Sequence, residues 1–380
     1  MTENFGTRAQ LALDAIHRQP ARGIPSWALF AMEHSVIEHL AGAGTGDYLR
    51  RPEKTYLAMQ RRAGTCFIDQ YIPTNPLSMG AHGYESGTEH GATTGAETIV
   101  LDGMAIDSPE AVVEHMEQFV FPQLRAAIQG HTAEYAEEMC REIIRCETTC
   151  QQEFGDDLLK VPHVQHFPNL RYGQYGYVNY FMAYALYPEV MEQDFALQAD
   201  LALLRNGAVA RAYCEAGLPP LCRLDHDMAD GRGTLVDIRS LDRIWFPHFT
   251  RCLAPLLQAG IRLIWHCDGN LMAMLPRLLE AGLQGFQGFQ YEHGMDYEAI
   301  CRMKTRDGEG LLIVGGVSVT RTLPHGTPAD VKRELQWLVE AGTKTGLFLG
   351  GSSSITPGVP LENILTLVEG LQYYQEKGRS

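Results

Sequence analysis

The chain has no long apolar run, no excess of positive charge and no paired cysteines. No window of eighteen uncharged apolar residues occurs, so a membrane-spanning helix is not expected. Acidic residues (46) outnumber Lys and Arg (31), and the formal net charge of −15 argues against nucleic acid or an anionic membrane surface as the main partner. The nine cysteines form no CxxC pair, which is typical of a reducing compartment. Because residues 1–8 are polar and lack a signal-peptide core, a cytoplasmic location is predicted.

Several short catalytic motifs are also missing. The sequence contains no nucleophile elbow, no P-loop, no HExxH and no GxGxxG after the first predicted strand. Nothing therefore points to an α/β-hydrolase, a P-loop nucleotidase, a zincin protease or a dinucleotide-binding enzyme. The apolar content of 45% with 20% charged residues is instead that of a globular protein with a large core.

One repeated unit organises the chain. An Ala-Gly pair ends a helical segment five times, and each pair is followed within a few residues by a short apolar run. Glycine is favoured at that position because the residue after a helix often adopts the left-handed conformation. The unit predicts alternating helices and parallel strands. The pairs stand at residues 63–64, 216–217, 259–260, 281–282 and 341–342.

The apolar runs add up to eight predicted strands, which suits a (β/α)₈ TIM barrel better than a doubly wound open sheet. The predicted strands are residues 24–30, 65–69, 158–164, 221–225, 261–265, 286–289, 311–315 and 347–349. Two regions depart from the repeat. Residues 80–95 are rich in Gly, Thr, His and Glu and are predicted to form a loop over one mouth, and residues 108–154 are predicted to be a helical insertion. Neither region has enough apolar residues for a core of its own, so residues 1–380 are expected to form one domain.

Polar residues end seven of the eight predicted strands. Active sites of such barrels lie at the carboxyl ends of the strands, and buried carboxylates are costly unless they are paired. The pattern therefore indicates a functional site. The residues concerned are Glu33, His34, Asp69, His163, His166, Asp225, His226, Asp227, His266, Asp268, Glu292, His293 and Ser352-Ser353-Ser354.

The pair His266 and Asp268, which follows the apolar run Leu263-Ile264-Trp265, is the strongest candidate. The two side chains could be metal ligands, with a third ligand from another strand. They could also be an acid–base unit in which the carboxylate orients the imidazole. The third interpretation is a hydrogen-bonded histidine and an ordinary turn at a strand end. Cys267 lies between them and is expected to face the opposite side of the strand.

Asp225 and Asp227 are two residues apart and share a face of an extended chain. Neighbouring carboxylates raise one another's pKa, as suits a general acid or a cation site, and a solvated loop is the alternative. Asp69 ends another apolar run, where an unpaired carboxylate would be costly.

Several segments resemble the uroporphyrinogen decarboxylase superfamily, which includes porphyrin decarboxylases and the related cobalamin-dependent methyltransferases. The resemblance covers most of the chain outside residues 108–154 and independently implies a (β/α)₈ barrel. Its two specific motifs are HCDGN at residues 266–270 and TPGVPLENI at residues 356–364. Weaker matches are RGIPSW at residues 22–27, FID at residues 67–69 followed by Met79-Gly80, and GYVNYF at residues 176–181.

Departures from the decarboxylase pattern argue against porphyrin as the substrate. Asp69 matches the decarboxylase's essential aspartate. The family's arginine-rich segment is replaced here by Ala31-Met32-Glu33-His34, and its C-terminal histidine corresponds to Ser353. In the methyltransferase branch, zinc is bound by His-x-Cys and a later Cys and activates a thiol. His266 matches the family's histidine, whereas Asp268 and Ser353 replace the two cysteines, so an oxygen-rich site suits a harder cation or a zinc that polarises an oxygen.

The resemblance thus implies an enzyme that demethylates a small methylated substrate, such as an O-methyl ether, and passes the methyl group to a corrinoid on a separate protein. Zinc or another divalent metal is expected, and a homodimer is compatible with the sequence. The alternatives are a decarboxylase acting on a different acid and a non-catalytic ligand-binding barrel. The expected catalytic residues are Asp69, Asp225, Asp227 and His266; the substrate-binding residues Glu33, His34, Asn270 and Ser353; and the metal ligands His266, Asp268 and Glu292.

Overall fold

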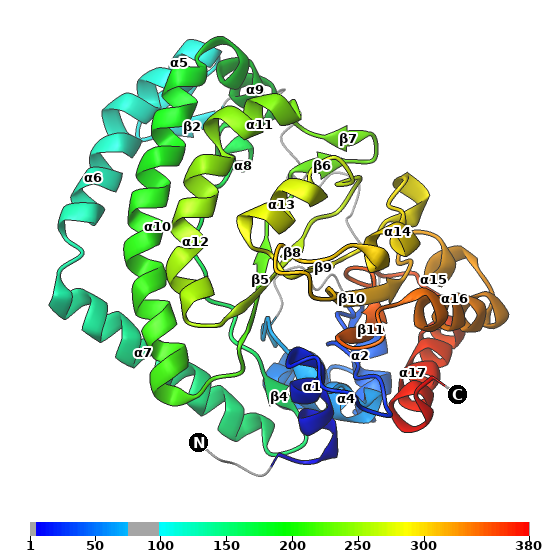
Figure 1. Ribbon diagram of the computed structural model, residues 1–380. Helices are drawn as coiled ribbons and strands as arrows, with labels where there is room; N and C mark the ends of the chain where they lie inside the picture. Colours follow the sequence, from blue (N-terminus) through cyan, green and yellow to red (C-terminus); the bar gives the residue numbers. More distant parts are fainter. Residues whose placement is uncertain (1–4, 75–98, 380) are drawn as a thin grey trace.

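The computed structural model describes residues 5–74 and 99–379, and the strands around its core pair in parallel, as in a TIM barrel (Figure 1). Five of them form a continuous sheet in the order β11-β10-β9-β8-β5. The bounds are β5 Leu221–Asp225, β8 Arg262–His266, β9 Gly285–Gln287, β10 Leu312–Val317 and β11 Leu347–Gly351. The predicted loop at residues 80–95 lies outside the described residues.

The remaining strand positions extend this sheet around the core. Ser26 bridges to Leu349 of β11, and Trp27 bridges to Phe67 of β1 (Phe67–Ile68), which pairs in parallel with β4 (Leu159–Lys160). All eight predicted strands therefore contain parallel strand residues, and the predicted (β/α)₈ barrel fold is confirmed.

One junction of the barrel lacks a backbone ladder. Within the described ranges, no strand pairing joins β4 to β5. The buried Tyr213 hydroxyl lies there instead, 3.1 Å from the carbonyl of Leu221 and 3.5 Å from that of Pro162. We call this junction the β4–β5 seam.

Helices cover the outside of the sheet. Four precede β1 or lie between the first strand and β1: α1 Thr7–Ile16, α2 His34–Ala41, α3 Asp47–Arg50 and α4 Pro52–Ala63. Seven follow β5: α11 Ile238–Ile244, α12 Phe246–Gln258, α13 Leu275–Ala281, α14 Tyr297–Arg302, α15 Thr322–His325, α16 Pro328–Ala341 and α17 Leu361–Lys377. Among the described residues, no helix is both long and apolar enough to cross a membrane.

Four of the five predicted glycine helix ends adopt the left-handed conformation. Gly64, Gly217, Gly260 and Gly282 have φ between 59° and 112°. Gly342 is the exception, with an extended backbone at φ −64°, and the positive φ falls on Gly346 four residues later. The chain therefore turns into β11 at Gly346 rather than directly after α16.

The segment predicted as a helical insertion is helical. A hairpin of β2 (Ile99–Leu101) and β3 (Met104–Ile106) precedes it, and it contains α5 Pro109–His115, a π-helical turn Met116–Val120, α6 Phe121–Gln129 and α7 Ala133–Phe154. After β4 come α8 Tyr172–Tyr175, α9 Tyr177–Leu186 and the 29-residue helix α10 Pro188–Ala216. α10 packs between α12 and α7, so the insertion lies against the barrel on the flank next to the seam (Figure 1).

Candidate metal and active site

Strand register brings the polar strand ends together. Asp225 at the end of β5 pairs with His266 at the end of β8, and His266 pairs with Gln287 of β9. Asp227 and Asp268 each follow two residues later, and residues two apart along an extended chain share a face. Adjacent parallel strands thus deliver one imidazole and several carboxylates to the same mouth of the barrel.

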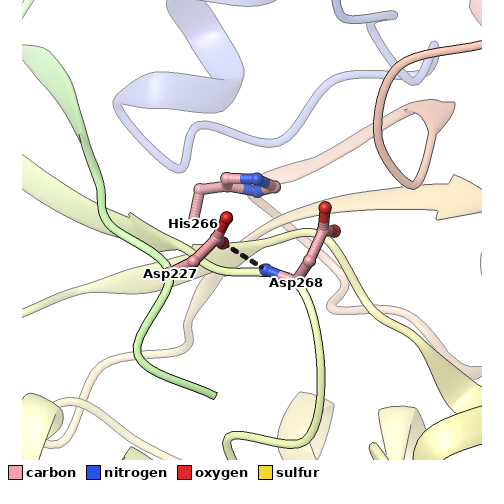
Figure 2. A group of neighbouring side chains, drawn as sticks. All are labelled: Asp227, His266 and Asp268. Atoms are coloured by element: carbon pink, nitrogen blue, oxygen red, sulfur yellow. Dashed lines mark hydrogen bonds between the residues drawn. The ribbon is translucent and has the colours of Figure 1, made fainter. Parts of the chain in front are cut away.

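Asp227, His266 and Asp268 form a compact group. Each offers one ligand atom, and these atoms all lie within 4.8 Å of one another. Figure 2 shows the three side chains rising on the same side of the chain, with the Asp227 carboxylate accepting a hydrogen bond from the backbone N–H of Asp268. That bond is 3.0 Å long, and the Tyr172 hydroxyl donates to the Asp227 carbonyl at 2.8 Å. The two loops are therefore tied to each other, and one carboxylate oxygen of Asp227 is engaged in that contact.

Two atoms of this group are buried without a partner. His266 Nδ1 and Asp268 Oδ1 have no hydrogen bond within the described part of the chain, and the other Asp268 oxygen lies 3.4 Å from the Ser353 hydroxyl. Burial raises the pKa of Asp268, the neighbouring Asp227 and Asp225 carboxylates add to the rise, and His266 opposes it. Buried polar atoms are normally satisfied, so an unpartnered nitrogen beside an unpartnered carboxylate oxygen fits a cation site.

The donor set suits a divalent metal. One imidazole and two carboxylates are ligand types used by zinc, and oxygen-rich sets suit harder cations. Cys267 does not contribute, because its sulfur faces the other way and accepts a hydrogen bond from the backbone N–H of Met228 at 3.3 Å. The residues present therefore fit the metal that the resemblance implies.

Glu292, the expected third ligand, is placed elsewhere. It lies in the short 3₁₀ turn Tyr291–His293, and its carboxylate accepts hydrogen bonds from the hydroxyls of Ser318 and Thr320. Asp227, expected as a catalytic residue, takes the third position of the group. The structure does not bring Glu292 into this group, because the 3₁₀ turn directs its carboxylate to the loop after β10.

Asp69 and Asp225 are tied together by Arg223. The guanidinium donates to Asp69 Oδ2 through Nε and to Asp225 Oδ2 through Nη1, both at 2.6 Å, and the Trp27 indole N–H donates to Asp69 Oδ1 at 3.0 Å. Burial alone would raise the pKa of Asp69, but the charge of Arg223 holds it well below its usual range. Both Asp69 oxygens are thus engaged, and this carboxylate shapes the barrel interior rather than offering a free acid or base.

Arg223 is the site residue that the sequence reasoning missed. It lies two residues before Asp225 in β5, and both point to the same face by strand alternation. Arg223 precedes Asp225 by the same spacing that separates Asp225 from Asp227, so strand alternation already places it on their face.

The residues expected to contact substrate have mixed positions. Ser353 lies beside Asp268, as described above. Glu33 precedes α2 and accepts hydrogen bonds from Ser35 and from the backbone N–H of Gly358. The Asn270 side chain accepts from the backbone N–H of Met272 at 3.1 Å, and the His34 ring packs 5.1 Å from that of Tyr48. Of the four residues expected to bind substrate, Ser353 is the one that the structure brings into contact with the group of Asp227, His266 and Asp268.

A cavity of about 700 Å³ opens beside the group. Asp227 and Asp268 lie on one side of it, and Tyr177 and Phe181 of α9 form an aromatic wall. The β6–β7 hairpin (β6 Ala229–Asp230, β7 Gly233–Thr234) lines another side. Gly269 packs so tightly there that a Cβ would lie 2.6 Å from the Asp230 carbonyl oxygen, and its φ is +91°. The site thus combines a candidate cation position with room for a small organic molecule.

Comparisons with known proteins agree with this description. Residues 205–374 match the model of the family described as uroporphyrinogen decarboxylase. A structure described as a methyltransferase from Methanosarcina mazei shares the fold, with a TM-score of 0.56 and 14% sequence identity over 98% of this chain and 99% of that one. A comparison with curated proteins gives no match. The resemblance predicted from the motifs is thereby confirmed for residues 205–374, the part of the chain that contains both specific motifs.

Proposed function

We propose that the protein is a single-domain cytoplasmic methyltransferase. It removes a methyl group from a small methylated substrate, such as an O-methyl ether, and passes it to a corrinoid on a separate protein. The observation that carries the proposal is the group Asp227, His266 and Asp268, which contains two buried polar atoms without a partner in the described residues and lies beside a cavity of about 700 Å³. The shared fold with a methyltransferase supports it.

Each part of the site has a role in this proposal. Asp227, His266 and Asp268 would hold the metal, and Arg223 holds Asp225 behind them. The aromatic wall of Tyr177 and Phe181 positions the substrate and excludes water. When bound, a divalent metal supplies Lewis-acid polarisation of the leaving oxygen. The carbon–oxygen bond would break with its electron pair left on the oxygen, which would take a proton from solvent, and a reduced corrinoid on the partner would supply the electron pair for its new bond to the methyl group.

The oxygen donors favour an oxygen leaving group over thiol activation. Asp268 and Ser353 occupy the positions at which the resemblance implies sulfur ligands. The Ser353 hydroxyl lies 3.4 Å from Asp268 Oδ2. Carboxylate ligands leave more positive charge on a cation than thiolates do, which suits polarisation of an ether oxygen. The decarboxylase alternative, which needs Asp69 as its key group, gains no support because both oxygens of Asp69 are engaged.

The test compares two neighbouring substitutions in one assay. Demethylation of methoxyacetate and 2-methoxybenzoate is followed with reduced cobalamin as methyl acceptor, using zinc-loaded protein. We expect His266→Ala to abolish transfer, whereas the control Cys267→Ala, whose side chain faces away, keeps it. If the protein binds no metal and His266→Ala demethylates as fast as the wild type, the proposal is wrong. Release of CO₂ from an acid substrate, lost in Asp69→Asn but not in His266→Ala, would identify a decarboxylase instead.

A further inference from the structure

A second cavity lies at the β4–β5 seam. Its volume is about 280 Å³, and it is bounded by residues 165–171 after β4, by α10 and by Leu124 of α6. It reaches Asp225 at the end of β5. The lining is mostly polar and includes the side chains of Gln165, His166, Arg171 and Arg205. This seam cavity is distinct in its lining from the cavity beside Asp227 and Asp268.

The walls of the seam cavity are rigidly built. Asn206 of α10 is fully buried, accepts from the backbone N–H of His166 at 3.0 Å and donates to the His166 carbonyl at 2.8 Å. Arg171 forms a bidentate pair with the fully buried Asp194, with distances of 2.8 and 3.0 Å. The segment after β4 is therefore fastened to α10 on both sides of the cavity.

Arg205 is the cation of this cavity that lacks a counter-charge. It is half-buried, and no hydrogen bond or ion pair to it is found within residues 5–74 and 99–379. The acidic neighbours are already engaged, since Asp194 pairs with Arg171 and Asp225 pairs with Arg223. Arg211, six residues along the same helix, instead pairs with Glu137 and Glu215.

His166 supplies a second unsatisfied group. Its Nε2 atom is buried and has no partner in the described part of the chain. Burial, with the nearby charge of Arg205, lowers the pKa of His166 to about 4, so the ring is neutral near pH 7 and can donate one hydrogen bond. A buried ring nitrogen without a partner is costly, a guanidinium without a counter-charge attracts an anion, and one ligand with acceptor oxygens would satisfy both.

We propose that the seam cavity binds a small oxyanion, a carboxylate or a phosphate, through Arg205, with His166 and Gln165 as neutral hydrogen-bonding partners. The planar guanidinium matches both anions because it presents parallel N–H donors. The cavity is slightly smaller than those that hold drug-sized ligands, so a ligand or ligand group of few atoms fits it. This site does not depend on the proposed methyl transfer.

Binding is tested by titration calorimetry with inorganic phosphate and with acetate at constant ionic strength. The protein used is His266→Ala, so that an anion held by a metal at the other site is not counted. We expect saturable binding of one anion per chain, weakened at least about tenfold by adding Arg205→Met. Arg205→Lys keeps the charge but loses the parallel N–H donors of the guanidinium, so its affinity for the anion should lie between those of the parent protein and of Arg205→Met. The matched control Arg211→Met removes a cation from the same helix and should leave the affinity unchanged.

Each outcome decides the proposal. Tighter binding of phosphate or of acetate identifies which oxyanion the cavity takes, and either result supports it. If neither anion binds saturably, or if Arg205→Met and Arg205→Lys bind as tightly as the parent protein, the proposal is overturned. Thermal melting of each variant shows whether it is folded, and the charge-preserving Lys variant decides the question if the Met variant does not fold.

Discussion

Arg223 explains how a barrel interior tolerates two carboxylates so close together. Arg223 and Asp69 are almost completely buried, with 4% and 3% of their side chains exposed, and Asp225 shares the same guanidinium. Burying an ion is expensive unless its partner is in good geometry. The Arg223 network therefore fixes the ends of β1 and β5 and places Asp225 next to His266.

Removing one charge from this network should be strongly destabilising. Asp69→Asn leaves Arg223 with a weaker partner in a buried place, and we predict a loss of about 3 kcal/mol in the free energy of unfolding. Denaturant titration measures this. The control Asp157→Asn breaks the exposed pair with Arg8 and should change stability by less than about 0.5 kcal/mol. Equal effects of the two substitutions would contradict the role given to Arg223.

The same pair predicts a pH dependence. Because Arg223 holds the pKa of Asp69 below its unfolded value of about 4, the pair's contribution is fully present above that pH and is lost as the pH falls further. The wild type should therefore lose more stability between about pH 4 and pH 2.5 than Asp69→Asn does. Parallel acid-unfolding curves for the two proteins would show that the carboxylate is not paired.

At the residue scale, the sequence predicted His266 and Asp268 correctly as neighbours because both belong to one strand end. It named Glu292 as a metal ligand and Asp227 as a catalytic residue, whereas the structure brings Asp227 into the group with His266 and Asp268. The path of the loop after each strand decides this, and no periodic pattern encodes that path. Arg223 lay within reach of the alternation argument, since its spacing from Asp225 is two residues.

Among the elements, α10 braces the part of the barrel that backbone pairing leaves open. Its Asn206 side chain bonds the His166 backbone on one side and the Cys252 carbonyl of α12, at 2.8 Å, on the other. These bonds stand beside a seam where β4 and β5 form no ladder in the described residues. Hydrogen bonds from helix α10 therefore hold the chain at this seam, where backbone strand pairing holds it elsewhere in the barrel.

Replacing this amide should loosen the seam. Asn206→Leu keeps a similar volume but removes three buried hydrogen bonds to backbone groups, and we predict a loss of at least about 2 kcal/mol in the free energy of unfolding. Faster amide exchange over residues 163–171 should accompany it. Gln336→Leu, on the exposed face of α16, is the control and should be nearly neutral. Unchanged exchange in the Asn206 variant would show that α10 does not brace the seam.

The Ala-Gly units predicted the order of helices and strands because a helix end and a buried strand are both local patterns. The missing β4–β5 pairing could not be predicted in this way, since it depends on how the insertion and α10 sit against the barrel. The turn into β11 also differed, with the left-handed glycine at Gly346 instead of Gly342. Local patterns thus located the elements, and contacts distant in sequence set their junctions.

For the whole molecule, the proposed metal should couple to stability. A ligand that binds only the folded state stabilises it, by about 2.7 kcal/mol at a concentration about 100-fold above its dissociation constant. Zinc should therefore raise the melting temperature of chelator-treated protein. Asp227→Asn should remove this effect, whereas Glu292→Gln should keep it. If zinc still raises the melting temperature of Asp227→Asn but not that of Glu292→Gln, Glu292 rather than Asp227 is the third ligand.

The central claim is that Asp227, His266 and Asp268 together hold a divalent cation. Anomalous diffraction from zinc-soaked crystals, collected on both sides of the zinc absorption edge, tests it most directly. We predict one strong peak at the barrel mouth, about 2.0–2.2 Å from a ring nitrogen of His266 and from a carboxylate oxygen of each aspartate. A map with no peak among these three side chains, or with its main peak at other residues, would contradict the account.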